Sequence, residues 1–148
     1  MSNPIAYDVK VKLLEDSSTP FSDDESAAWS IHISKEPERP KNVISVYATG
    51  GKPPALYFDT SHPSTEYPSF QVRVRGTDYM AVQDKMQEVR DAIEHNGNFL
   101  VTDIAGTCTY YMDIIPTTIP IDLPADKNNL YITVMSFYAL REERRPNP

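Results

Sequence analysis

The sequence predicts an α+β fold, in which an antiparallel or mixed sheet of about four to five strands carries helices on one face. Two observations predict it. One stretch changes its apolar period from that of a strand to that of a helix, and β-branched or aromatic runs gather toward the C-terminal half. Bulk composition agrees, since 40% hydrophobic residues over 148 positions suit one folded core.

The strand-to-helix change lies between Tyr67 and Ile93. Its first part alternates apolar and polar residues, as in a half-buried strand: Phe70, Gln71, Val72, Arg73, Val74 and Arg75. Gly76 ends that run, and Thr77 or Asp78 can cap a helix by accepting hydrogen bonds from free backbone N–H groups. The next apolar residues recur every three or four positions, at Tyr79, Val82, Met86, Val89 and Ile93. Asn96-Gly97 provides a helix stop.

The first residues admit two interpretations. Asn3-Pro4 suits a helix start, because proline in the first turn loses no helical hydrogen bond. One helical face would then hold Ile5, Val9 and Leu13. The alternative is a strand, because Tyr7, Val9, Val11 and Leu13 alternate. The Asn-Pro start favours the helix.

Four further runs of alternating or continuous apolar residues predict strands: Trp29–Ile33, Val43–Tyr47, Thr107–Ile115 and Leu130–Leu140. Two proline-rich stretches, Thr49–Tyr67 and Pro116–Asn129, predict long loops, and Asn98–Gly106 is an ambiguous connection. The expected domain covers residues 1–140, and residues 141–148 form a charged, frayed tail.

Charge and cysteine content narrow the function classes. A net charge of −7 argues against binding nucleic acid by neutralising phosphates. One cysteine excludes an intrachain disulfide and fits a reducing compartment. The first residues lack the apolar core of a signal peptide, and no run reaches the roughly 18–20 apolar residues of a membrane span. The expectation is a product synthesised in the cytoplasm without a membrane partner.

Catalytic, metal-binding and cofactor patterns are missing from the sequence. His32, His62 and His95 are scattered, with no ligand at metal-site spacing. Cys108 lies in an apolar run, which favours a buried inert thiol over a nucleophile. Gly50-Gly51 lacks the spaced glycines and the Lys-Ser/Thr of a phosphate loop. The expectation is therefore no enzyme, no metal and no cofactor.

Two charged groups admit a structural and a functional interpretation. Asp84, Glu88 and Asp91 share one side of the central helix, either as a solvated face or as an acidic surface toward a partner or channel. Arg73 and Arg75 can form weak cross-strand ion pairs, or pair bidentately with carboxylates of a neighbouring subunit.

Three features in this order resemble the tail terminator proteins of long-tailed bacteriophages. They are the entry from Glu36-Pro37 to Thr49-Gly50-Gly51-Lys52-Pro53-Pro54, the run Gln71-Val72-Arg73-Val74-Arg75-Gly76 after Tyr67-Pro68, and the aromatic-bearing helix that follows. The resemblance covers roughly Trp29 to Gly97, and it also implies an α+β architecture and a structural, non-enzymatic protein.

The resemblance implies a virion protein at the neck of the tail, assembled in the host cytoplasm. It would form a homo-hexameric ring that sits on the last ring of tail tube protein, stops polymerisation and presents a surface to the head–tail connector or stopper. The long loop is the expected contact segment, so the candidate interface residues are Thr49, Gly50, Gly51, Lys52, Tyr57, Arg73 and Arg75. The alternatives are another ring-forming neck or tail-joining protein, and a small α+β hydrolase.

The genome would pass through such a ring without specific binding. Six copies at −7 each would carry about −42, and like charge disfavours contact with phosphates. An acidic lumen is therefore expected, with Asp84, Glu88 and Asp91 as the candidates to line it.

Overall fold

The computed structural model describes residues 3–15, 21–22, 24, 26–55, 65–95, 98–102, 109–125 and 128–144. Within these ranges lie two helices and seven strands. In chain order they are α1 (Ile5–Glu15), β1 (Ser30–Ile33), β2 (Val43–Ala55), β3 (Thr65–Gly76), α2 (Tyr79–His95), β4 (Asn98–Thr102), β5 (Thr109–Pro116), β6 (Ile121–Leu123) and β7 (Tyr131–Arg144). The predicted α+β class is confirmed, with more strands than expected.

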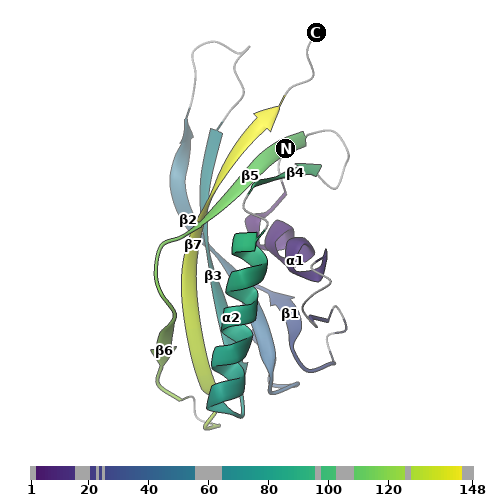
Figure 1. Ribbon diagram of the computed structural model, residues 1–148, viewed down its shortest axis with the longest axis vertical. Coiled ribbons are helices and arrows are strands. Elements are labelled where there is room, and N and C mark those ends of the chain that lie inside the picture. Colours follow the sequence, from purple (N-terminus) through teal and green to yellow (C-terminus); the bar gives the residue numbers. More distant parts are fainter. Residues whose placement is uncertain are drawn as a thin grey trace.

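One mixed sheet contains all the strands, in the order β1-β2-β3-β7-β5-β4, with β6 also beside β7. β1 and β2 are parallel, and every other pair is antiparallel. Figure 1 shows α1 and α2 on the same face of this sheet, and β7 running along most of its length. The other face, which carries the side chains of Arg73 and Tyr138, is called the outer face below.

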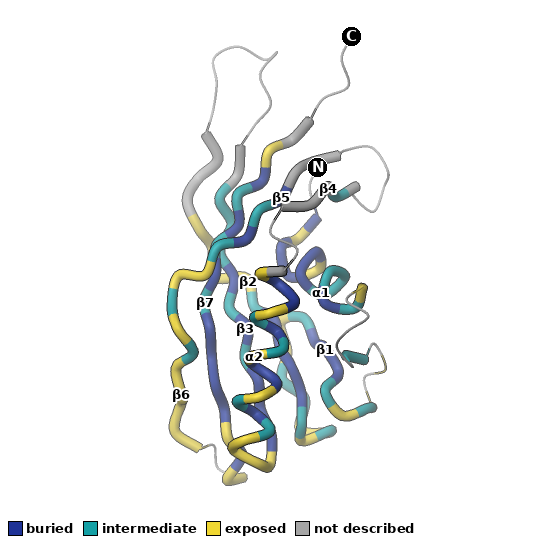
Figure 2. Tube along the Cα trace, in the orientation of Figure 1, coloured by how far each residue is buried: buried dark blue, intermediate teal, exposed yellow. Residues whose placement is uncertain are grey.

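The core lies between the helices and the inner face of the sheet. Cross-strand neighbours Phe70 and Phe137 stack there with ring centroids 5.1 Å apart, and Val72 pairs with Met135 one step along. Figure 2 shows buried residues along the middle of β3 and β7 and along the inner sides of both helices. The alternation predicted for residues 70–75 therefore selects the core face correctly.

The start of α2 also follows its sequence signals. Asp78 accepts a hydrogen bond from the N–H of Ala81 at 3.2 Å, so it is the residue that caps the helix. The predicted apolar stripe is buried except for its first member, Tyr79, which is 43% exposed. The predicted stop at 96–97 lies outside the described residues.

The N-terminal segment is a helix, so the alternative strand is wrong. The carbonyl of Pro4 accepts the first hydrogen bonds, from the N–H groups of Tyr7 and Asp8. The side-chain amide of Asn3 donates to the Asp8 carboxylate at 2.8 Å, so Asn3 anchors the helix through a side chain of its second turn.

The loop predicted over Thr49–Tyr67 is wrong at both ends, because β2 continues to Ala55 and β3 begins at Thr65. Gly50 and Gly51 adopt φ values of +94° and +120° and pair with Ser69 and Pro68 of β3. The register shifts between Ala48 and Gly50, so Thr49 is the extra residue of a β-bulge. Pairing steps over the two prolines, from Lys52 to Ala55. Residues 56–64 lie outside the described part of the chain.

Three other predictions along the C-terminal half need correction. The ambiguous connection after α2 contains β4, which pairs with β5. The loop predicted after Pro116 contains β6, whose three residues pair with β7. The expected tail begins inside β7, which runs on to Arg144 because β5 pairs with it over residues 137–144. Local sequence signals do not reveal these long-range pairings between strands.

Candidate assembly surface

Arg75 fastens a connector across the outer face of the sheet. The connector is the segment Ser34–Asn42, between β1 and β2. The Arg75 guanidinium donates to the carbonyl oxygens of Lys41 at 3.1 Å and Pro40 at 3.0 Å, and also to that of Pro37. Arg75 is 5% exposed and binds these carbonyl groups within its own chain, and its contact with a neighbouring subunit stays a prediction.

Arg73 lies beside the same connector but is partly exposed. Its guanidinium is 3.7 Å from the Glu36 carboxylate and 5.9 Å from the centre of the Tyr47 ring. Burial raises the pKa of the Tyr47 phenol, and the nearby negative charge of Glu36 raises it further. The intramolecular ion pair is thus present, and contact of Arg73 with another subunit stays a prediction.

Residues 50–55 of β2 and 65–69 of β3 form a paired extension, which is called the arm below. The expected contact residues Thr49, Gly50 and Gly51 are all exposed and lie at its base. A Cβ atom on Gly51 would lie 2.1 Å from the carbonyl oxygen of Tyr67, so only glycine allows the two strands to approach this closely. Lys52 belongs to β2, but its side chain is not part of the described structure. Tyr57 lies outside the described residues altogether.

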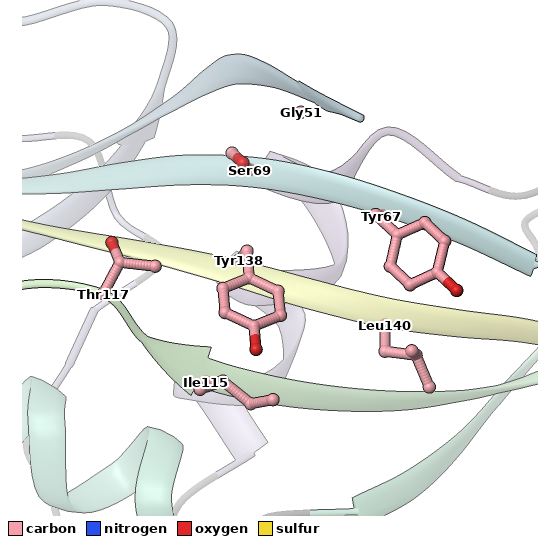
Figure 3. Close-up of a pocket in the computed structure, with 7 residues that line it drawn as sticks. All are labelled: Gly51, Tyr67, Ser69, Ile115, Thr117, Tyr138 and Leu140. Carbon is pink, nitrogen blue, oxygen red and sulfur yellow. The ribbon is translucent and has the colours of Figure 1, made fainter. Parts of the chain in front are cut away.

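A hollow of about 530 Å³ opens on the outer face beside this arm. Figure 3 shows its side chains converging from three neighbouring strands, with Tyr67 and Ser69 on β3, Tyr138 and Leu140 on β7, and Ile115 on β5. Gly51 and Thr117 complete the lining, and none of these residues carries a charge. Such a surface fits an apolar segment of another protein better than a polar substrate.

Sequence reasoning missed this hollow. The alternation in Leu130–Leu140 places Tyr138 and Leu140 on one face. To predict the hollow, one would also need to know which strands lie beside β7. β5 pairs Ile115 with Tyr138, and β3 pairs Ser69 with Tyr138 from the other side. The hollow is therefore a product of strand order.

A second group of exposed apolar residues lies on β6 and just before it. Ile119, Ile121 and Leu123 are 74%, 52% and 38% exposed. The last two lie on β6, and no described strand pairs with its other edge. Between them, Asp122 points to the helix side, where it accepts hydrogen bonds from Tyr79 at 3.0 Å and Gln83 at 2.7 Å. Helix α2 thus fixes a strand whose apolar side chains face solvent.

The acidic residues of α2 occupy its outward side. Asp84 and Asp91 are exposed, and Asp91 accepts a hydrogen bond from Gln87 at 2.8 Å. Glu88 is 2.5 Å from the ammonium of Lys85, which lies over the rings of Phe21 and Trp29. Whether this side faces a channel stays a prediction.

The described residues contain no group of three or more His, Cys, Asp or Glu side chains that could hold a metal ion. His32 is buried on β1, with Nε2 2.8 Å from the Ser30 hydroxyl, which is a structural role. His62 and Cys108 lie outside the described residues, as does the side chain of His95. No helix in the described ranges is long and apolar enough to cross a membrane.

Comparison with protein families shows which class of protein carries these exposed apolar surfaces. A model of the bacteriophage tail terminator protein family matches residues 17–143. The chain belongs to this family. A search of curated proteins finds no match.

The matched range includes the whole sheet up to the last residues of β7, so membership rests on the complete strand framework and not on one motif. The predicted resemblance is confirmed. A tail terminator is a structural component of the phage tail that works through contacts with other tail or head proteins. The exposed apolar hollow and the uncovered edge of β6 are the described features best suited to such contacts.

Proposed function

We propose that this tail terminator forms a six-membered ring at the head-proximal end of the tail tube, ends tube polymerisation and joins the tail to the head connector. Family membership carries the proposal. The structure supports it through an apolar hollow and a free strand edge, since both are surfaces that a monomer leaves exposed to water.

Termination requires two unlike faces. One face of the ring complements the last tube ring, and the opposite face offers no docking surface for further tube protein. The chain is asymmetric in this sense: Figure 1 shows the arm beside the C-terminal part of β7 and β6 beside its N-terminal part. The hollow lies next to the arm, since Gly51, Tyr67 and Ser69 line it. The proposed contacts with a neighbouring protein are Thr49, Gly50 and Gly51 at the base of the arm, and Lys52 and Tyr57 further along the sequence.

The acidic side of α2 has two possible uses in such a ring. It can line the channel, where like charge keeps Asp84, Glu88 and Asp91 from holding the genome. It can also face a basic surface of the adjacent copy. In either arrangement the net charge of −7 disfavours duplex binding, so the isolated protein should not retain DNA at physiological salt.

The test is to add purified protein to tails made without it, and to examine the product by electron microscopy and native mass spectrometry. The expected result is one ring of six copies at the head-proximal end of tubes that then accept heads. Isolated copies at the neck, or a ring at the opposite end, would contradict the proposal. A ring at the neck whose absence leaves tube length unchanged would favour the alternative, a neck or tail-joining protein that does not end polymerisation.

A further inference from the structure

Arg39 and Lys41 differ from the other basic side chains of the described part of the chain. Arg73, Lys85, Arg90 and Arg141 each lie within salt-bridge distance of a carboxylate, and Arg75 binds carbonyl groups. Lys10, Lys12 and Lys35 also make polar contacts. Among the described basic side chains, only Arg39 and Lys41 have no partner within the described residues, and both are exposed.

The two side chains project from a fixed backbone. With Ser26 and Pro40 they line an open hollow of about 630 Å³, which is called the basic hollow here. Arg75 donates hydrogen bonds to the carbonyl oxygens of Pro40 and Lys41. The side chain of Asn42 accepts a hydrogen bond from the N–H of Thr77 at 3.1 Å. Because these hydrogen bonds already hold its backbone, the basic hollow would lose conformational freedom mainly in its two basic side chains on binding an anionic group.

Carboxylates on a second copy of this chain suit the basic hollow. The protein carries 21 acidic and 14 basic residues, so a partner copy offers many carboxylates. On α2, Asp84 makes no polar contact within the described residues, and Asp91 binds only a neutral amide. They lie seven residues apart, so they share one side of the helix and are separated by about 10 Å along its axis. Two cations can thus meet two carboxylates.

The positions of the two patches favour contact between copies. α2 covers the inner face of the sheet, whereas the connector that carries Arg39 and Lys41 crosses the outer face. A head-to-tail interface joins two different patches, and it closes into a ring when the rotation permits. Complementary charge on such patches fixes the register of the contact and suppresses wrong partners.

We propose that Arg39 and Lys41 of one copy bind Asp84 and Asp91 of the adjacent copy in the ring. This inference rests on the proposed ring and names its subunit contact. Met80, one turn before Asp84 and 61% exposed, would lie beside the same interface as an apolar contact. The acidic side of α2 then faces a neighbouring copy in place of the channel.

A charge exchange tests the contact, with assembly onto terminator-free tails as the readout. The double variants Arg39→Glu/Lys41→Glu and Asp84→Lys/Asp91→Lys should each lower the fraction of ringed tails about tenfold or more, because like charges then meet. The fourfold variant that combines them should recover most of the wild-type fraction. Glu15→Lys/Glu142→Lys is the control for Asp84→Lys/Asp91→Lys, since it makes the same charge change at two exposed residues elsewhere.

Three results would overturn the inference: rings formed normally by either double variant, no recovery in the fourfold variant, or an equal loss of rings in the Glu15→Lys/Glu142→Lys control. In each case the proposed ring would stand as long as the wild-type protein forms rings. Absence of rings with wild-type protein would instead contradict the proposed function.

Crosslinking of wild-type rings gives a second measurement that does not depend on variant folding. A zero-length carbodiimide reagent, applied to rings assembled from a mixture of isotopically light and heavy protein, should join Lys41 to Asp84 or Asp91 in mixed-isotope peptides. Crosslinked rings that yield no mixed-isotope peptide joining Lys41 to Asp84 or Asp91 would also overturn the inference.

Discussion

The Arg141 guanidinium donates a hydrogen bond to the Asp8 carboxylate at 3.0 Å, although 133 positions separate the two residues. Their side chains are 6% and 2% exposed. The pair joins α1 to the C-terminal part of β7 on the inner face of the sheet, and Asn3 donates to the same carboxylate. One buried ion pair thus closes the first helix onto the last strand.

Breaking this pair from one side should destabilise the protein strongly. Arg141→Met leaves the Asp8 charge buried, so the free energy of unfolding should fall by about 3–5 kcal/mol. The double variant Asp8→Leu/Arg141→Met should recover a large part of that loss, because no buried charge remains. Urea unfolding followed by circular dichroism measures both. A loss below about 1 kcal/mol in the single variant would show that the pair is not buried in solution.

The strand–helix unit could be predicted from sequence because its determinants are local. The alternation from Phe70 to Arg75, the cap at Asp78 and the helical apolar stripe each act within a few residues. The same pattern also placed Arg75 on the polar face of its strand. The pattern could not show that a connector covers that face, because the carbonyl groups that Arg75 binds lie 34 to 38 residues earlier in the sequence.

Other elements depend on neighbours that no local pattern supplies. β6 has only three residues and exists because β7 provides a free edge beyond the end of β5. The glycine–proline stretch after Tyr47 contains residues typical of loops, yet it is strand because β3 lies beside it. The hollow beside Tyr138 needs three strands in a particular order, so the candidate surface was harder to predict than the fold class.

Gly51→Ala should weaken the arm. The added methyl group would meet the Tyr67 carbonyl oxygen, and φ of +120° is unfavourable for alanine. We expect a loss of about 1–3 kcal/mol in unfolding free energy, with faster amide exchange at the base of the arm. Gly50→Ala is the matched control, because it also has positive φ but its Cβ would meet nothing within 4 Å. Equal losses in the two variants would mean that the close approach is unimportant.

The contact between Tyr79 and Asp122 should make stability fall at alkaline pH. The hydrogen bond from the Tyr79 phenol to the Asp122 carboxylate raises the pKa of Tyr79, and repulsion between the Asp122 charge and an ionised phenol raises it further. The stabilisation is therefore complete below the ordinary tyrosine pKa of about 10 and is lost as pH rises through the raised value. Tyr79→Phe should flatten the decline in unfolding midpoint as pH rises above about 10. Tyr7→Phe, at another exposed tyrosine, should leave the decline as in wild type.

A charge placed in the hollow should block assembly without unfolding the protein. Tyr138→Arg puts a guanidinium among Tyr67, Ile115 and Leu140, which a partner's apolar segment would have to bury unpaired. The hollow is open to water, so the charge stays solvated in the free protein and the unfolding free energy should change by less than about 1 kcal/mol. Ringed or head-joined tails should fall about tenfold or more.

Gln71→Arg is the control for this variant, since it makes a similar change on the same sheet face outside the hollow lining. Both proteins are compared by thermal unfolding and by addition to terminator-free tails. Normal assembly of Tyr138→Arg would exclude the hollow as a contact surface. Equal defects in both variants would show that any added cation on this face disturbs assembly, whether or not the hollow is occupied. A defect confined to Tyr138→Arg identifies the hollow as a surface that assembly covers, because only there does the new charge lose its water.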